Sequence, residues 1–221
     1  MNKKPEEASQ KLSVQQYSLL QRAFDHFNEE LFGGELPQVI MTLHRHRGAV
    51  GYFSPERFTL RADAEMSVHE IALNPDYFRE TIPTTRTLST LVHEQVHLWQ
   101  AEFGEKKPKR AYHNREWADK MEEVGLMPST TGDSHGKRTG QRCTHYIMSG
   151  GRFEHVAANF LAATHDAFLV NAKPHDLELK KNDKNKVCYE CGTCLQKAWA
   201  KPEAKLICGN CDEPMPPKEK N

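Results

Sequence analysis

The sequence predicts an α+β domain followed by a small cysteine-rich module. Three features support this: helical spacing of apolar residues, short β-branched segments between the helical ones, and a cluster of cysteines near the C-terminus. The 221 residues suffice for one full domain and a second, smaller one. The 30 basic and 30 acidic residues balance, which excludes a strongly basic, histone-like protein.

The sequence predicts neither a membrane-spanning helix nor a secretory signal. No apolar run approaches the roughly 18 residues that a membrane helix needs. The N-terminal lysines have no apolar stretch behind them, so we expect no secretory signal and a cytoplasmic protein. Five of the six cysteines lie between Cys188 and Cys211, which in a reducing compartment indicates a metal site rather than a disulfide framework.

The N-terminal part is expected to contain one helix and a small sheet. Residues 1–11 are charged and include a proline, which predicts a disordered tail. Between residues 12 and 31 apolar side chains recur every three or four positions, which predicts an amphipathic helix that ends at Gly33 and Gly34. Its apolar face consists of Tyr17, Leu20, Phe24, Phe27 and Leu31. Two or three short strands are predicted at 39–43, 48–53 and 68–73.

The next part is expected to be mainly helical. A helix is predicted from about residue 86 to 103, with Thr84 or Thr85 as its N-cap. A shorter helix is predicted from Asn114, a favourable N-cap, to residue 124, just before a glycine. A loop and a further helix are expected at 129–142 and 155–170.

The longer of these helices carries the sequence His93-Glu94-Gln95-Val96-His97, an H-E-x-x-H motif. Residues four apart share one face of a helix, so the two imidazoles can point at one ion. Zn²⁺ accepts imidazole nitrogen, and a catalytic zinc keeps one position for water. Glu94 lies about 100° around the helix from His93, where it can reach that water as a general base.

The spacing leaves the third ligand open. His113 follows His97 by 16 positions, a gap that lets the chain turn back towards the helix. Glu116 and Asp119 are rivals, because carboxylates also bind Zn²⁺. Hydrogen-bonded core histidines without a metal are the structural alternative for the whole motif.

These residues resemble the SprT-like family, whose eukaryotic member is Spartan. The similarity lies in Thr90–Trp99 and in the stretch His113-Asn114-Arg115-Glu116-Trp117. It extends upstream to Glu70–Pro75 and downstream to Gly140-Gln141 and His145-Tyr146, and it spans about residues 15–212.

The resemblance implies a zincin-like metallopeptidase domain, in which an active-site helix packs on a small sheet. It implies His93, His97 and His113 as ligands of a catalytic zinc and Glu94 as the general base. It also implies protein substrates, which for Spartan are proteins attached to DNA. Motifs of the Spartan type that bind partners beyond the core are not apparent in this sequence.

The cysteines fit a zinc ribbon. Two C-x-x-C pairs separated by 13 residues can supply four thiolates, with a hairpin expected between Trp199 and Ile207. The first pair is either Cys188 with Cys191 or Cys191 with Cys194. Similar members of the family pair the two cysteines that precede an Ala-Trp-Ala-Lys-Pro stretch, here Ala198–Pro202. The resemblance thus implies a structural zinc held by Cys191, Cys194, Cys208 and Cys211, with Cys188 spare.

Other residues are weaker candidates. His145 or Tyr146 could stabilise an oxyanion opposite the metal. The basic loops 106–110 and 180–186, together with the ribbon, could contact DNA phosphates, with a solvated surface as the alternative. Cys143 is expected to pack as a small apolar residue.

The sequence thus predicts a zinc-dependent endopeptidase that cleaves proteins, including DNA-associated ones. A non-catalytic, zinc-containing nucleic-acid-associated factor is the alternative. The expected division is a tail, a SprT-like zincin domain, a linker, a zinc ribbon and a second tail, at 1–11, 12–170, 171–187, 188–212 and 213–221.

Overall fold

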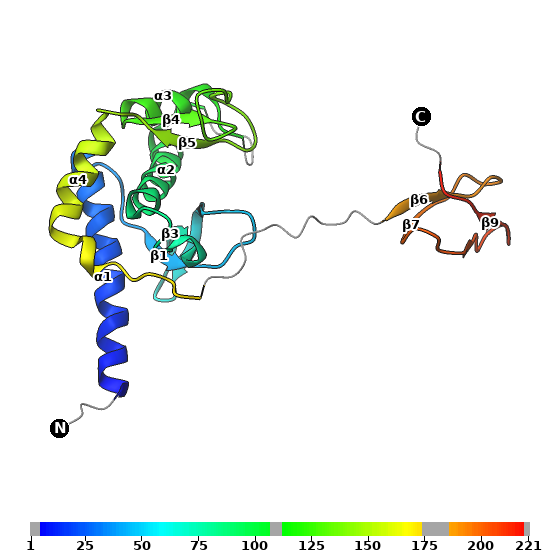
Figure 1. Cartoon of the computed structure of the whole chain (residues 1–221), viewed down its shortest axis with the longest axis horizontal. Coiled ribbons are helices and arrows are strands. Elements are labelled where there is room, and N and C mark those ends of the chain that lie inside the picture. The colour runs from blue at the N-terminus through cyan, green and yellow to red at the C-terminus, as the bar shows by residue number, and fades with distance from the viewer. Residues whose placement is uncertain (1–4, 107–111, 174–185, 219–221) are drawn as a thin grey trace. The chain divides into compact units, whose positions relative to one another are not determined.

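The computed structural model of the chain describes residues 5–106, 112–173 and 186–218 (Figure 1). The chain divides into two compact units, Met1–His175 and Asp176–Asn221. Each unit is described by itself. The predicted tails, the basic loops and the linker fall partly outside the described residues, at 1–4, 107–111, 174–185 and 219–221.

The first unit begins with the long helix α1 (Pro5–Phe32). The prediction of a disordered tail over residues 1–11 is wrong from residue 5 onward, where the backbone is helical. A proline suits the first helical turn because its missing N–H has no partner there in any case. The predicted apolar face is buried from Leu20 onward, and Phe24 and Phe27 are fully enclosed, whereas Tyr17 is exposed.

A three-stranded sheet follows, with the order β1-β3-β2. Its strands are β1 (Ile40–Leu43), β2 (Gly51–Leu60) and β3 (Asp63–Leu73). The central strand β3 runs parallel to β1 and antiparallel to β2. All three predicted strands exist, and β2 and β3 extend beyond their predicted ends as a hairpin. Ile71 and Leu73 of β3 are buried in the core.

The helix α2 (Thr84–Phe103) crosses the interior of this unit. Its residues from Thr87 to Val96 are all buried, because α1, the sheet and the helices that follow pack around it. The predicted bounds hold to within two residues, but neither threonine caps the helix. Pro83 occupies the N-cap position, and no side chain caps this end.

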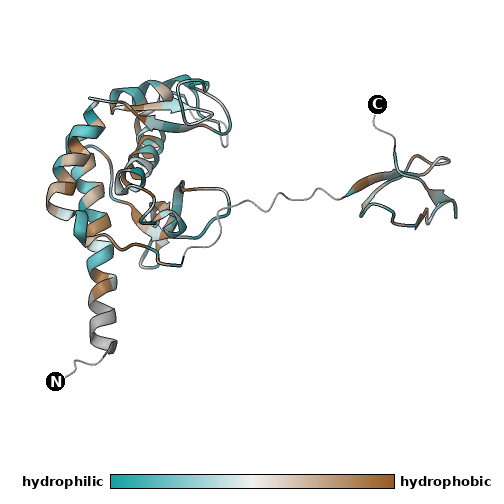
Figure 2. Ribbon diagram, viewed as in Figure 1, coloured by the Kyte–Doolittle hydropathy of each residue, from teal (hydrophilic) through white to brown (hydrophobic). Residues whose placement is uncertain are grey.

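The helix α3 (Arg115–Glu123) has the predicted cap, since the Asn114 side chain accepts a hydrogen bond from the backbone N–H of Trp117. The strands β4 (Leu126–Ser129) and β5 (Thr144–Ile147) form an antiparallel pair that was not predicted. The helix α4 (Arg152–Thr164) starts earlier and ends earlier than predicted, and packs against α1. Hydrophobic and hydrophilic residues alternate along α1 and α4 (Figure 2).

The second unit consists of two small hairpins. One pairs β6 (Val187–Glu190) with β7 (Lys197–Ala200), and the other pairs β8 (Leu206–Ile207) with β9 (Pro214–Met215). Each hairpin turns through a C-x-x-C pair. The predicted hairpin between Trp199 and Ile207 is therefore wrong, because the strands pair across each cysteine turn instead.

The predicted tail from residue 213 is wrong as far as Lys218. Its backbone N–H donates to the carbonyl of Cys188, and its ammonium group pairs with Glu190 at 2.8 Å. This segment thus adds to the edge of β6. In the described part of the chain, helices are too short or too polar to span a lipid bilayer.

Candidate metal centre

The helix α2 presents His93 and His97 on one face, one turn apart, with their ring centroids 5.1 Å from each other. Gln95, between them in the sequence, lies on another face, where its side-chain amide donates to the carbonyl of Phe24 on α1. This bond ties the rotation of α2 to α1. The helical spacing therefore produces the shared histidine face that the motif predicts.

His113 reaches this face from the segment before α3. The Nε2 atoms of His97 and His113 are 3.1 Å apart, and its Nδ1 lies 3.1 Å from the carbonyl oxygen of Gly140. Two backbone hydrogen bonds also join His113 to Gly140. The carbonyl can only accept, so it fixes the proton on Nδ1 and leaves the lone pair of Nε2 directed at His97.

The three histidines form a cluster whose ligand atoms all lie within 4.8 Å of one another. Two ligands at the usual Zn–N distance in a tetrahedral site are ~3.3 Å apart, close to the separation of the two Nε2 atoms. The rival carboxylates are engaged elsewhere. Glu116 accepts from the backbone of Glu105, and Asp119 pairs with Arg138. The spacing alone could not separate these candidates, and in the structure His113 is the one that lies in the cluster with His93 and His97.

Burial favours the neutral form of the histidines in the cluster. Burial lowers the pKa of His97 to about 3, with a further lowering from the neighbouring His113. Burial also lowers the pKa of His93 well below its ordinary value and lowers that of His113. A neutral imidazole is the form that binds a metal, so these pKa shifts keep the donor atoms available.

Glu94 is buried beside the cluster, and its carboxylate accepts a hydrogen bond from the backbone N–H of Phe53 on β2. Burial raises the pKa of Glu94 to about 8, although this hydrogen bond lowers it in part. Gly51 lets β2 approach closely. A Cβ atom there would lie 2.9 Å from the Thr90 side chain and 3.3 Å from Oε1 of Glu94. The edge of the sheet thus closes over the acidic residue.

Trp117 of α3 lies against all three histidine rings, and sequence analysis assigned it no role. Its ring centroid is 4.4 Å from that of His113, 4.9 Å from that of His93 and 5.1 Å from that of His97. The side chain is fully buried. One large rigid ring therefore supports the whole cluster, and its position four residues after His113 was the available signal.

His145 of β5 packs behind His93. Its Nδ1 lies 3.1 Å from Nδ1 of His93, and its Nε2 lies 2.9 Å from the hydroxyl oxygen of Ser89. The ring is 3% exposed. Both of its nitrogens are thus engaged within the protein, which disagrees with the expected role opposite the metal. Sequence analysis did not single out Ser89, although it lies one helical turn before His93.

The second unit brings together the sulfurs of four cysteines within 4.8 Å of one another: Cys191, Cys194, Cys208 and Cys211. Cys188 is outside this group and lies opposite Trp199 in the β6–β7 ladder. Backbone N–H groups of Cys194 and Thr193 lower the pKa of Cys191 to about 7, because they stabilise its thiolate. The neighbouring Cys194 sulfur, in contrast, raises the pKa of Cys211 to about 12 in the metal-free group. A thiolate is the form that binds a metal.

The two cysteine turns share one backbone pattern, offset by 17 residues. Leu195 donates to the carbonyl of Cys191, and Asp212 donates to that of Cys208. Both donors have positive φ angles, 61° and 55°. Two turns of the same form therefore point their sulfurs at one centre.

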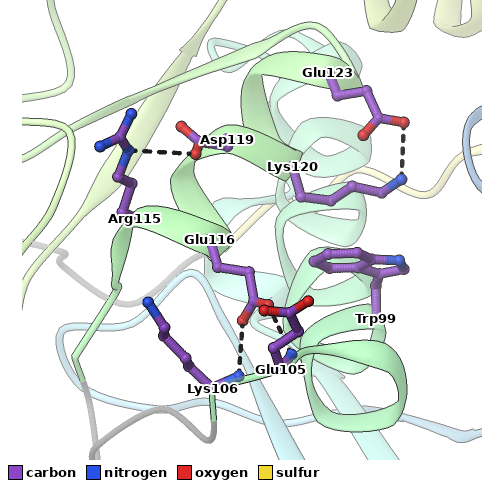
Figure 3. A pocket seen from close by; sticks show the side chains of 8 residues that line it. All are labelled: Trp99, Glu105, Lys106, Arg115, Glu116, Asp119, Lys120 and Glu123. Carbon is purple, nitrogen blue, oxygen red and sulfur yellow. Dashed lines mark hydrogen bonds and ion pairs between the residues drawn. The ribbon is translucent and has the colours of Figure 1, made fainter.

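A surface pocket of about 360 Å³ lies between the end of α2 and α3, and none of the histidines lines it (Figure 3). Charged side chains and one aromatic ring line it: Trp99, Glu105, Lys106, Arg115, Glu116, Asp119, Lys120 and Glu123. Their charges are largely paired with one another, as for Lys120 with Glu123 at 2.8 Å. Lys120 also lies over the Trp99 ring.

The chain is similar in sequence to one known protein family and to one curated protein. The sequence model of the SprT-like family matches residues 20–137, which include the H-E-x-x-H helix and His113. A curated protein of Salmonella typhimurium, described as "Uncharacterized protein in mucB 3'region", is 47% identical over 55 residues. That stretch is 25% of this chain and 73% of the relative. No solved structure matches the chain.

Proposed function

The chain belongs to the SprT-like family, and on that premise we propose that it is a zinc-dependent endopeptidase with Glu94 as its general base. The observation that carries the proposal is the convergence of three neutral imidazoles beside one buried carboxyl group. The family resemblance predicts the same set of residues.

The donor set fits zinc. His93, His97 and His113 would hold the ion, since imidazole nitrogen is a preferred ligand and the three ligand atoms lie within 4.8 Å of one another. Three protein ligands leave a coordination position for water, as catalytic zinc sites require. When bound, zinc supplies Lewis acidity that activates water and polarises a peptide carbonyl.

Glu94 would move the proton. Its carboxylate takes a proton from the water that attacks the peptide carbonyl and passes it to the departing amine. Burial without a nearby cation gives the carboxyl group its pKa of about 8. A positive charge in the adjacent cluster favours the carboxylate, and so places Glu94 in its basic form near neutral pH.

The second unit would hold a structural zinc through Cys191, Cys194, Cys208 and Cys211. Four thiolates leave no position for water, so this site suits a structural role. The core of the unit is small and includes Tyr189 and Met215 besides two of the cysteines. A module of this size generally needs its metal to fold.

Proteins are the proposed substrates, and proteins bound to DNA are the proposed special case. The predicted contacts with DNA are the basic loops at 106–110 and 180–186 and the ribbon. On the ribbon, Trp199 is 62% exposed, and Lys197 lies two residues before it on the same strand face. An exposed aromatic ring beside a cation is a surface on which single-stranded nucleic acid can stack.

Replacing Glu94 with Gln tests the proposal. We expect Glu94→Gln to keep both zinc ions and to lose at least 100-fold in cleavage of an unfolded protein such as casein. Glu102→Gln, on the same helix, is the control and should cleave normally, because Glu102 contacts His69 away from the cluster. Cleavage by Glu94→Gln at the normal rate would exclude Glu94 as the base.

The alternative function is a non-catalytic factor that binds nucleic acid through the ribbon. The exposed Trp199 beside Lys197 is the observation that favours it. In that case the chain binds DNA in a salt-dependent way, Glu94→Gln leaves binding unchanged, and neither casein nor a protein crosslinked to DNA is cleaved.

A further inference from the structure

A series of hydrogen bonds leads from His93, in the candidate metal centre, to the backbone of Arg86. Nδ1 of His93 faces Nδ1 of His145 at 3.1 Å, and Nε2 of His145 faces the Ser89 hydroxyl at 2.9 Å. The Ser89 hydroxyl in turn donates to the carbonyl oxygen of Arg86 at 3.0 Å. The chain therefore ends on a group that can only accept a hydrogen bond.

With the Ser89 hydroxyl donating to Arg86, one arrangement of the protons follows along the chain. Because the Ser89 hydroxyl donates its proton to Arg86, its oxygen accepts from His145. Nε2 of His145 is then the protonated nitrogen, and its Nδ1 carries a lone pair. Nδ1 of His93 must therefore donate to that lone pair, which leaves Nε2 of His93 unprotonated. An unprotonated Nε2 is what a metal ligand requires.

Arg86 also holds the strand β5, which carries His145. Its guanidinium group donates to the carbonyl of His145 at 3.2 Å and to the Thr144 hydroxyl at 3.3 Å. Arg86, near the start of α2, thus accepts the hydrogen bond from Ser89 and also binds the β5 strand. The His145 ring is enclosed, so water does not compete for its nitrogens.

We propose that His145 and Ser89 are positioning residues of the metal centre, which hold His93 in its Nδ1-protonated tautomer with Nε2 free for the ion. The inference rests on the proposed metal centre but not on peptidase activity. His113 is set in the same way by the carbonyl of Gly140. The carbonyl of Gly140 can only accept a hydrogen bond, so it needs no further partner. The imidazole of His145 can donate or accept, so His145 needs Ser89 to make its Nδ1 the acceptor.

The first test measures the tautomer directly. The full chain is labelled with ¹⁵N, and long-range ¹⁵N–¹H correlation spectra are recorded before and after the addition of zinc. The His93 signals are assigned by their loss in His93→Gln. We expect a protonated Nδ1 on His93 both without and with zinc. A protonated Nε2 on His93 in the zinc-free chain would overturn the proposal.

The second test compares two replacements of His145 by their zinc affinity. Asn places its side-chain oxygen close to the position of Nδ1, so His145→Asn keeps an acceptor for His93, whereas His145→Leu keeps only bulk. Zinc is titrated into the full chain against a chromophoric chelator. We expect His145→Leu to bind zinc at the histidine site 10- to 100-fold more weakly, and His145→Asn to stay within about threefold of the original chain.

A merely structural role for His145 predicts a different pattern. Both variants would then bind zinc alike, either at the original affinity or equally weakened, and either result overturns the proposal. If His145→Leu does not fold, Ser89→Ala replaces it, because loss of one hydroxyl leaves the packing nearly intact. We expect Ser89→Ala to bind zinc more weakly and to give a mixture of His93 tautomers, while unchanged affinity and a single tautomer would contradict the assignment.

A further variant separates this inference from the proposed function. His113→Ala identifies which zinc transition belongs to the histidine site. If His113→Ala loses no zinc, the metal centre itself is wrong. If it loses one zinc while His145→Leu binds normally, the metal centre stands and only the positioning role fails.

Discussion

Nε2 of His97 and Nε2 of His113 lie 3.1 Å apart, although 16 positions separate the two residues in the sequence. The helix α2 holds the first ring, and the backbone pairing of His113 with Gly140 holds the second. The distance between the two nitrogens therefore depends on three segments of the chain. Only one of these segments carries the H-E-x-x-H motif.

Replacing His113 should remove one metal ion. We expect the full chain to bind two zinc ions and His113→Ala to bind one, because two imidazoles alone hold zinc weakly. Elemental analysis after gel filtration measures the ratio. Glu116→Gln is the matched control, since Glu116 was a rival ligand and accepts hydrogen bonds from Glu105 and Gln100 instead. One zinc in Glu116→Gln would reverse the assignment of the third ligand.

Removing the tryptophan beneath the cluster should destabilise the first unit. Trp117 is fully buried, so Trp117→Ala is expected to lower the free energy of unfolding by about 3–5 kcal/mol. Urea unfolding followed by far-UV circular dichroism measures this, since the described helices all belong to the first unit. Trp99→Ala should cost less, because Trp99 is only half-buried and lines a surface pocket. An equal decrease in the free energy of unfolding for both variants would show that Trp117 contributes no more to the packing than Trp99.

Glu94 should make the stability of the zinc-free first unit depend on pH. Its pKa is about 8 in the folded chain against 4.5 for an ordinary glutamate, so the folded state keeps a proton that the unfolded state releases between these values. The stabilisation is complete below pH 4.5 and is lost as the pH rises through 8. Relative to the original chain, Glu94→Gln should therefore gain about 1.4 kcal/mol per pH unit within this window.

Urea unfolding with a chelator present, at several pH values, measures this difference. Groups that titrate in both proteins cancel from it. The buried histidines act in the opposite direction, because burial lowers the pKa of His97 to about 3, and their effect appears below pH 6.5 in both proteins. A difference that does not change between pH 5 and 8 would mean that Glu94 titrates alike in the folded and unfolded states.

Replacing single cysteines of the ribbon should show which of them bind zinc. Cys194→Ser is expected to lose one zinc and the folded structure of the second unit, because one thiolate of the four is missing. Cys188→Ser should keep both, since Cys188 lies in the ladder opposite Trp199. Zinc content and the backbone ¹⁵N–¹H signals of residues 186–218 follow this change. Loss of zinc in Cys188→Ser would instead select the other register of cysteines.

The helices at the site were predictable because local patterns determine them. Apolar spacing and the H-E-x-x-H motif predicted α2, and Asn114 predicted the start of α3. The strands β4 and β5 were missed because they pair with each other across a loop rich in Gly, Ser and Thr. Such pairing depends on distant residues, which no local pattern reveals.

The same limit applied to the surroundings of the site. The sequence predicted His93 and His97 together, because a helix fixes their spacing, but left His113 with two carboxylate rivals. The link between His93 and His145 spans 52 positions and depends on the unpredicted β5 strand. The partners that orient a ligand are therefore harder to predict than the ligand itself.

The reciprocal amide bonds between His113 and Gly140 give the site a backbone reporter. Each residue donates its N–H to the carbonyl of the other, so neither amide can exchange with solvent deuterium unless this bridge opens. We expect an ion that holds the His113 ring in place to slow this opening as well. Occupancy of the cluster could thus be followed by exchange rates at two peptide groups, in a chain that is not turning over any substrate.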